Sequence, residues 1–230
     1  ETSIAEMAQG LVSRGIDLHV LPLGDRRDLA SRLEASGAVV HVRGLRPGRI
    51  GNVRSVKQVA RHINPSLVHT TLYESDIAGR IAASLLRLPA STSIVNDSYS
   101  ESHYAESNKA KLNAARAIDA ATALVARRFH AISGPIADSV APRLGIPRAK
   151  IQVIPRGRDP RSLPFQPAGV KQRTRGNLGI PAKSPVVLAI GRLEPQKGLH
   201  HLLNALPAVA NKHPGLVVII AGKDGRSSRE

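Results

Sequence analysis

The chain has 230 residues, of which 42% are hydrophobic and only 2% aromatic, and 33 Lys and Arg against 17 Asp and Glu give it a net charge of +16. This length allows one large domain or two small ones with a real core, and the absence of cysteine excludes disulfide frameworks, thiolate zinc sites and cysteine nucleophiles. The charge indicates an anionic partner, such as nucleic acid, anionic lipid or a phosphorylated substrate, or only an arginine-rich solvated surface.

Helical and strand patterns alternate through the first 158 residues. Apolar spacing of three and four predicts helices, and short apolar runs predict strands. The expected helices are 1–15, 26–36, 52–63, 75–86, 105–124 and 133–144. The expected strands are 18–23, 39–42, 66–70, 93–95, 129–132 and 151–154. This α/β alternation predicts a doubly wound parallel sheet that is buried on both faces.

The pattern changes at residues 159–184, which are rich in proline and glycine and predict a linker with one short helix. After it, a strand, a helix and a second strand form one βαβ unit, at 186–190, 199–209 and 216–220. A two-stranded parallel sheet is too small to be stable alone. We therefore expect a piece of a longer protein, cut at both ends. Its expected parts are a Rossmann-like domain without its first strand at 1–160, a linker at 161–184, and the start of a second Rossmann-like domain at 185–230.

The sharpest candidate site is the segment GRLEPQKG at 191–198, which joins the strand at 186–190 to the following helix. Open α/β sheets bind ligands at the carboxyl ends of their strands. Gly191 permits close backbone approach, and the helix N-terminus supplies free N–H groups and a positive dipole end. Arg192 and Lys197 add full positive charges. The segment predicts a diphosphate site, and a glycine turn with two exposed cations is the alternative.

This segment closely resembles the G-R-L-x-x-x-K-G signature of the GT4-type (group 1) glycosyltransferases, which are retaining enzymes of the GT-B fold. Residues 131–133, 144–147 and 150–159 are similar to the stretch that crosses between the two domains in this family. The start of the chain at Glu1 resembles the end of the family's glycine-rich loop, and 217–225 resembles its later strand and glycine turn. The resemblance covers essentially the whole chain.

The resemblance implies transfer of a hexose from a nucleotide-diphosphate sugar to a hydroxyl acceptor, with retention of the anomeric configuration. It assigns Arg192 and Lys197 to the donor diphosphate, where they would offset charge on the leaving group, and Gly191 and Gly198 to the same site. Such cations can replace some of the work of a metal ion, so no metal and no cofactor beyond the nucleotide sugar is expected. The donor nucleotide, the sugar and the acceptor (polysaccharide, lipid-linked or small molecule) stay open.

The chain also departs from the family pattern at several positions. The usual Asn of I-P-N-G is Arg156, and Arg158 replaces an apolar residue, so these arginines either add charge toward a substrate or lie at the hinge. Many members have a histidine where this chain has Asn96 and Asp97, and we assign no catalytic base there. The family's E-x7-E segment would lie beyond Glu230.

The densest basic run comprises Arg43, Arg46, Arg49, Arg54, Lys57 and Arg61. On the helix expected at 52–63, the last three of these share the face opposite the apolar stripe. This pattern is typical of a solvated helix, and it also fits contact with anionic lipid or a phosphorylated lipid acceptor. His69 is expected to be structural, and His200 and His201 to lie at the surface, with no metal-site spacing anywhere in the chain.

Two other functions stay open at this point. One is a sugar-nucleotide epimerase or another relative with the GT-B fold. The other is a basic nucleic-acid-binding module, which the scattered charge and the small number of aromatic side chains disfavour, so no nucleic-acid partner is expected. No apolar run reaches the roughly 20 residues that span a bilayer, and the expected location is the cytoplasm, with peripheral contact to the inner face of the membrane as an option.

Overall fold

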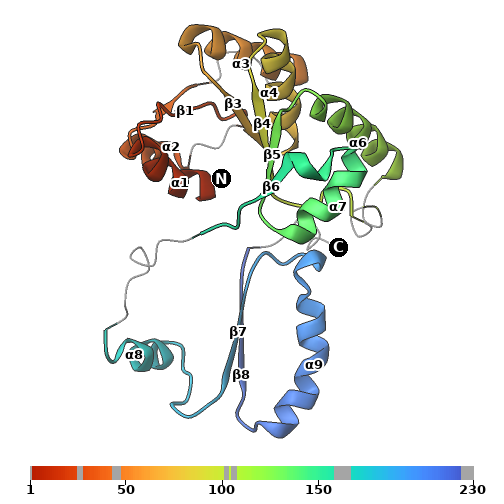
Figure 1. Ribbon diagram of the computed structural model, residues 1–230. Coiled ribbons are helices and arrows are strands. Elements are labelled where there is room, and N and C mark those ends of the chain that lie inside the picture. Colours follow the sequence, from red (N-terminus) through yellow and green to blue (C-terminus); the bar gives the residue numbers. More distant parts are fainter. Residues whose placement is uncertain are drawn as a thin grey trace. The chain divides into compact units, whose positions relative to one another are not determined.

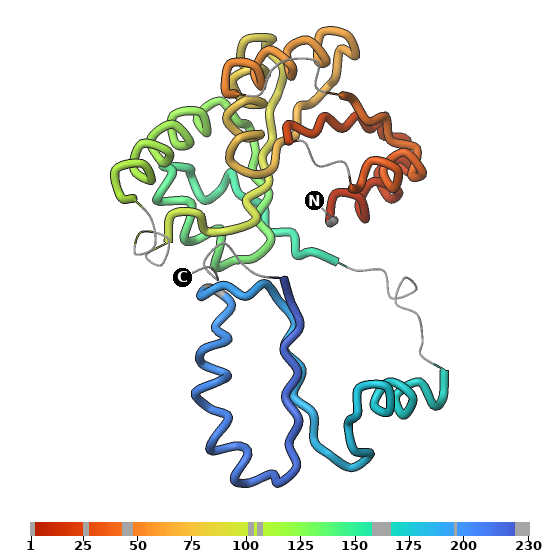
Figure 2. Tube along the Cα trace, turned by 180° about the vertical axis from the view of Figure 1, so that it is seen from behind, coloured from red at the N-terminus to blue at the C-terminus, as the bar shows by residue number. Residues whose placement is uncertain are grey.

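The computed structural model describes residues 2–24, 28–42, 48–100, 104, 108–157 and 167–223. The chain divides into two compact units, residues 1–158 and 159–230, which are described separately below. Figures 1 and 2 show the course of the chain from two opposite sides. Predictions that concern Glu1, Arg26, Arg43, Arg46, Arg158, Asp159 and Gly225 lie outside the described residues.

The first unit alternates helices with strands that pair only in parallel wherever the structure describes them. The helices are α1 (Thr2–Val12), α2 (Ala30–Ala35), α3 (Arg49–Ile63), α4 (Tyr73–Leu85), α6 (Lys109–Ala123), α7 (Gly134–Leu144) and the 3-10 turn η1 (Arg148–Lys150). The strands are β1 (His19–Val20), β2 (Val39–Val40), β3 (Val68–Thr71), β4 (Ala90–Ile94), β5 (Arg128–Ala131) and β6 (Ile151–Val153). Strand β1 pairs with β2, and the other four form a sheet in the order β3-β4-β5-β6.

Several boundaries differ from the sequence-based expectation by a few residues, and two of these differences have a clear local reason. Helix α3 begins at Arg49, three residues early, directly after Gly48, whose φ of 130° is one that glycine adopts easily. Strand β4 begins at Ala90 rather than Ser93, because the polar segment Ala90–Ser93 pairs in register with Val68–Thr71 of β3. The serine and threonine side chains of β4 hid this strand from a search for apolar runs.

Helices α4, α6 and α7 cover one face of the four-stranded sheet, and α3 packs against α4 (Figure 1). Their side chains form the main core with one face of the strands, and its members are Ile94, Tyr99, Ala123, Ala126, Phe129, Ala131, Ala137, Val140, Ala141, Leu144, Ile146 and Ile151. A smaller cluster joins α1 and α2 to their neighbouring strands through Ala5, Ala8, Leu33 and Ala38. Alanine is frequent in both clusters, so this chain, which has few aromatic residues, builds much of its core from small side chains.

The second unit is built around one βαβ motif. It contains α8 (Val170–Asn177), β7 (Val186–Ile190), the 3-10 turn η3 (Pro195–Lys197), α9 (Leu199–Lys212) and β8 (Val217–Ala221). Strands β7 and β8 pair in parallel from Val186 with Val217 to Ile190 with Ala221. Helix α8 is the one short helix expected in the linker region. Among the described residues, no helix combines the length and apolarity that a membrane crossing requires.

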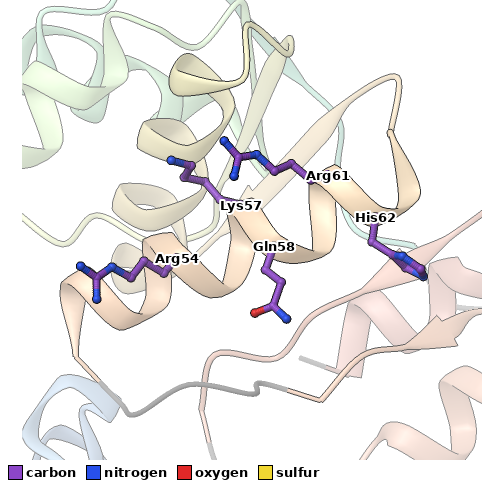
Figure 3. Close-up of a pocket in the computed structure, with 5 residues that line it drawn as sticks. All are labelled: Arg54, Lys57, Gln58, Arg61 and His62. Atoms are coloured by element: carbon purple, nitrogen blue, oxygen red, sulfur yellow. The ribbon is translucent and has the colours of Figure 1, made fainter.

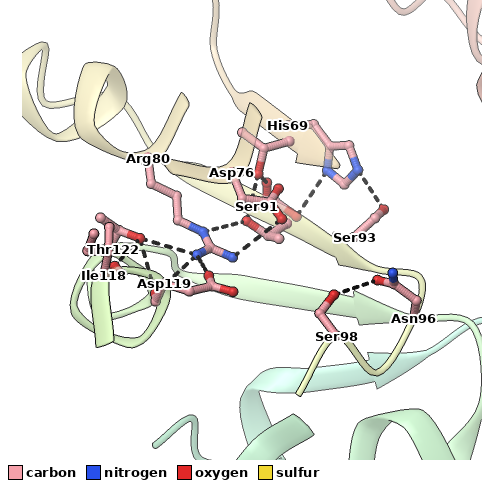
Figure 4. A network of polar contacts seen from close by, with 12 residues as sticks. His69, Asp76, Arg80, Ser91, Ser93, Asn96, Ser98, Ile118, Asp119 and Thr122 are labelled. Carbon is pink, nitrogen blue, oxygen red and sulfur yellow. Dashed lines mark hydrogen bonds and ion pairs between the residues drawn. The ribbon is translucent and has the colours of Figure 1, made fainter. Parts of the chain in front are cut away.

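A buried arginine lies at the centre of the first unit and was not anticipated from the sequence (Figure 4). Arg80 of α4 is 1% exposed, and its Nη1 lies 2.6 Å from Oδ1 of Asp119 on α6. Its Nε donates to the Thr92 hydroxyl at 3.0 Å. The second carboxylate nearby, Asp76, is 4.0 Å from Nη2 of Arg80. One guanidinium thus faces two carboxylates, and the closer one, Asp119, balances its charge.

Asp76 is therefore the surplus acid of this cluster, and we expect it to make stability depend on pH. Burial raises the pKa of Asp76 from 3.8 to about 7, against the opposing attraction of Arg80. Between these two values the folded chain holds a proton on Asp76 that the unfolded chain releases. The stability of the first unit is therefore highest below pH 4, where both states are protonated, and it falls as the pH rises to 7. The full shift corresponds to about 4 kcal/mol. Asp76→Asn should flatten the dependence of the first unit's stability between pH 4 and 7, measured by thermal unfolding. Equal slopes for the variant and the parent would contradict this assignment.

Candidate functional site

The predicted segment 191–198 continues directly from the carboxyl end of β7. The pairing of β7 with β8 extends beyond the strands, because the Gly191 amide donates to the Ala221 carbonyl at 3.0 Å and the Leu193 amide to the Lys223 carbonyl at 3.1 Å. The turn η3 follows, and α9 begins at Leu199. The segment is thus fixed at both ends, by the sheet on one side and by α9 on the other.

Two glycines meet where β7 and β8 end. A Cβ atom added to Gly222 would lie 1.7 Å from the Gly191 carbonyl oxygen, so only glycine fits at position 222. The sequence points to Gly191 as the residue that needs free space, but a Cβ there would meet only Lys197 Cγ, at 3.9 Å. At this edge of the sheet it is therefore Gly222 that must be glycine. The sequence pattern indicates this residue only as part of a later strand and turn.

Arg192 is held by an acidic neighbour that sequence reasoning missed. Its Nη1 lies 2.7 Å from Oε1 of Glu194, whose side chain is 10% exposed, whereas the Arg192 side chain is 60% exposed. Glu194 therefore orients the guanidinium while leaving most of it open to solvent. The available signal was an acidic residue two positions after the arginine within one short loop.

Lys197 ends the turn η3 and is exposed. Its Cγ atom lies close to Gly191, so the stem of the lysine passes over the first residue of the segment. Gly198 adopts a left-handed conformation with φ of 67°, which reverses the chain between η3 and α9 and favours glycine. Of the four predicted site residues, Gly191, Arg192 and Lys197 are thus gathered at the end of β7, and Gly198 leads the chain into α9.

The chemistry available at this edge of the second unit is that of an anion site. Two exposed cations and one carboxylate leave one net positive charge on the loop. The N-terminus of α9 directly follows, and the first amides of a helix attract negative charge. Among the described residues, no group of three or more His, Asp or Glu side chains could hold a metal ion.

In the first unit, the sheet face opposite α4 carries a chain of polar contacts through two histidines. His69 Nε2 lies 2.9 Å from the Ser93 hydroxyl, and His130 Nδ1 lies 3.1 Å from that same hydroxyl. The Ile154 carbonyl can only accept, so His130 Nε2, at 2.9 Å, carries a proton and donates to it. In the neutral state the Ser93 hydroxyl then donates to His130, and His69 donates to Ser93.

Burial lowers the pKa of His69, and the nearby His130 lowers it further. The His69 ring is therefore neutral near pH 7, in agreement with the donor and acceptor roles assigned above to His69, Ser93 and His130. The expectation of a structural role for His69 agrees with these contacts. The sequence alone could not predict these contacts between His69, Ser93 and His130, because they depend on the register between β3, β4 and β5.

The residues that replace the family's histidine, Asn96 and Asp97, follow strand β4. Asp97 accepts a hydrogen bond from Arg143 Nη1 at 2.9 Å and another from the Ser139 hydroxyl, both on α7. Asn96 is exposed and accepts from the Ser98 hydroxyl at 3.2 Å. Asp97 thus ties the loop that follows β4 to α7.

The remaining sequence candidates lie at the surface. His200 and His201 are exposed, as expected, and the centroids of their rings lie 3.9 Å apart. Arg156 is exposed near the end of the described part of the first unit. Its two interpretations, substrate contact and hinge, both stay predictions.

Comparison with known proteins gives two family matches that together cover most of the chain. Residues 1–162 match the model of "Glycosyltransferase Family 4", and residues 170–230 match "Glycosyl transferases group 1". The chain is 26% identical over 254 residues to a D-inositol 3-phosphate glycosyltransferase of Acidothermus cellulolyticus. That alignment covers 99% of this chain and 55% of the relative, so the chain spans about half of the relative's length.

Solved structures show the same architecture. The crystal structure of Anabaena Alr3699/HepE in complex with UDP matches with a TM-score of 0.76 and 22% identity, over 99% of this chain and 58% of that one. The UDP-GlcNAc 2-epimerase of Neisseria meningitidis, bound to UDP-GlcNAc, matches with a TM-score of 0.58 and 13% identity, over 95% and 62% of the two chains. The predicted α/β fold of the GT-B type is confirmed, and the epimerase is the more distant of these two neighbours.

Proposed function

The chain belongs to glycosyltransferase family 4, and from this membership we propose that the complete protein transfers a hexosyl group from a nucleotide-diphosphate sugar to a hydroxyl acceptor. The observation that carries the proposal is the loop at the end of β7, where Arg192, Lys197 and the start of α9 form an open cationic site. The second unit would bind the donor, and the first would lie on the side of the acceptor.

The named relatives support the two substrate classes. Anabaena Alr3699/HepE was crystallised with UDP and with UDP-glucose, which supports a nucleotide-sugar donor. The Acidothermus relative is named for D-inositol 3-phosphate, which supports an acceptor that offers hydroxyl groups. Because this chain spans only about half of these proteins, the proposal applies to the complete protein.

The proposed chemistry is stabilisation of a leaving group. As the bond between the sugar and the β-phosphate oxygen breaks, negative charge grows on the diphosphate. Arg192, oriented by Glu194, and Lys197 would bind that oxygen more strongly in the transition state than in the ground state. We propose that these two cations serve without a bound metal ion and that the anomeric configuration is retained, as the family resemblance implies.

The test is a transfer assay on the complete protein with a panel of nucleotide sugars and hydroxyl acceptors. We expect a glycosylated product whose anomeric configuration, read by NMR, equals that of the donor, and a rate that EDTA leaves unchanged. An epimerase would instead change the sugar of the donor when no acceptor is present, and a nucleic-acid-binding module would show no turnover and a steep loss of nucleic-acid affinity with salt.

A further inference from the structure

A cationic pocket on helix α3 lies in the first unit, and none of its lining residues has a role in the proposed transfer (Figure 3). It is lined by Arg54, Lys57, Gln58, Arg61 and His62 and has a cavity volume of about 460 Å³. Pockets of this size hold small ligands. Every side chain in the lining is polar, and three of the five carry a full positive charge at neutral pH.

The three charges share one face of the helix. Positions 54, 57 and 61 follow the spacing of three and four that aligns side chains on a helix, and Lys57 and Arg61 extend from the same side of α3 in Figure 3. Arg54 and Arg61 are exposed, and Lys57 is partly buried. Grouping like charges costs energy, so this arrangement favours an anion between them.

The described part of the chain supplies no counterion for this group. The sequence contains no Asp or Glu between Glu34 and Glu74. Among the described residues, Arg54, Lys57 and Arg61 form no ion pair, whereas Arg80 and Arg143 each pair with an aspartate. Gln58 also belongs to the lining and brings a neutral amide, which extends from the opposite side of α3 from Lys57 and Arg61 in Figure 3.

We propose that the α3 pocket is a binding site for a phosphate group, carried by a small soluble molecule or by a lipid headgroup. Phosphate offers several acceptor oxygens and a multiple negative charge, which match a lining of guanidinium, ammonium and amide donors. The pocket lies in the first unit and the loop at 191–198 in the second, and the two share no residue, so the proposal does not rest on the proposed glycosyl transfer.

Lys57 provides a reporter for the test, because a bound anion shields its amine from acetylation. The complete protein is treated with an amine-acetylating reagent at physiological salt, and each lysine is quantified by mass spectrometry. At a concentration of inorganic pyrophosphate about ten times its Kd, we expect about tenfold slower acetylation of Lys57. Lys109 and Lys111, exposed cations on α6, serve as internal controls and should not change. Lys197 reports separately on the proposed donor site.

The source of the phosphate is distinguished by vesicles. Protection of Lys57 by pyrophosphate alone supports a soluble ligand. Protection only by phosphatidylglycerol vesicles, and not by phosphatidylcholine vesicles, supports a lipid headgroup. Equal protection of Lys57, Lys109 and Lys111, or no protection of Lys57 by either probe, would overturn the proposal.

Two double variants test whether the slower acetylation of Lys57 depends on the cations of this pocket. Arg54→Ala/Arg61→Ala keeps the reporter and removes two cations that contact the anion. It should raise the Kd read from protection of Lys57 by about tenfold, which corresponds to about 1.4 kcal/mol. Arg127→Ala/Arg173→Ala removes the same charge from exposed positions elsewhere and should leave protection unchanged. Equal effects of the two variants would show net charge rather than a site and would reject the proposal.

Discussion

Replacing Arg192 or Lys197 with alanine in the complete protein is expected to lower kcat by about 10²–10³-fold each, the cost of removing one preorganised donor to a developing oxyanion. Both side chains are exposed and lie on a short loop rather than in a core, so stability should change by less than about 1 kcal/mol. KM for the donor should rise less than kcat falls, because contacts to the diphosphate strengthen as the leaving group gains charge.

The control for this pair is Lys212→Ala, which removes an exposed cation from the last turn of α9, in the same unit but outside the loop at 191–198. It should leave kcat and KM unchanged. Steady-state rates for the three variants, with thermal unfolding to check folding, decide the matter. Unchanged kcat in both loop variants would remove Arg192 and Lys197 from the site, and an equal loss in Lys212→Ala would indicate a general effect of charge.

The loop at 191–198 could be predicted because its chemistry is local. Its glycines, cations and flanking strand and helix lie within one short stretch, so the sequence alone indicates where they meet. Two residues that contact this loop or its cations were missed, because their contacts depend on the folded structure and not on the sequence pattern. Gly222 comes from the next strand and touches Gly191 only because β7 and β8 pair in register. Glu194 has no role in the sequence-based prediction, and only its 2.7 Å contact with Arg192 shows that it orients the guanidinium.

The parallel α/β architecture was predictable for a similar reason, since apolar periodicity reports burial residue by residue. The features that the sequence did not predict are those that depend on buried polar residues. The serines and threonines of β4 pair with β3 and His69, and the sequence pattern assigned only the end of that strand. Arg80 and Asp119 lie 39 positions apart, and only the packing of α4 on α6 makes them partners.

Arg80→Met is expected to destabilise the first unit by about 3–5 kcal/mol, the usual cost of leaving a buried charge without its partner. Arg80 is 1% exposed and spans three elements through Asp119, Thr92 and Thr122. Methionine keeps the long apolar stem beside Phe129, whose ring centroid is 5.7 Å from the Arg80 guanidinium carbon, so the loss is mainly electrostatic. Native-state hydrogen exchange at the amides of β4 and α6 measures this unit without interference from the second.

The charge left behind, rather than the lost contacts, should dominate this cost. Asp119 keeps one hydrogen bond, from the Tyr99 hydroxyl at 2.8 Å, which cannot balance a buried negative charge. The double variant Arg80→Met/Asp119→Asn should therefore be more stable than Arg80→Met alone. Arg148→Met is the matched control, because its partner Asp138 is 68% exposed, and it should cost less than about 1 kcal/mol. If Arg80→Met costs no more than Arg148→Met, or if Asp119→Asn destabilises it further, the cluster is held by packing and the electrostatic account is wrong.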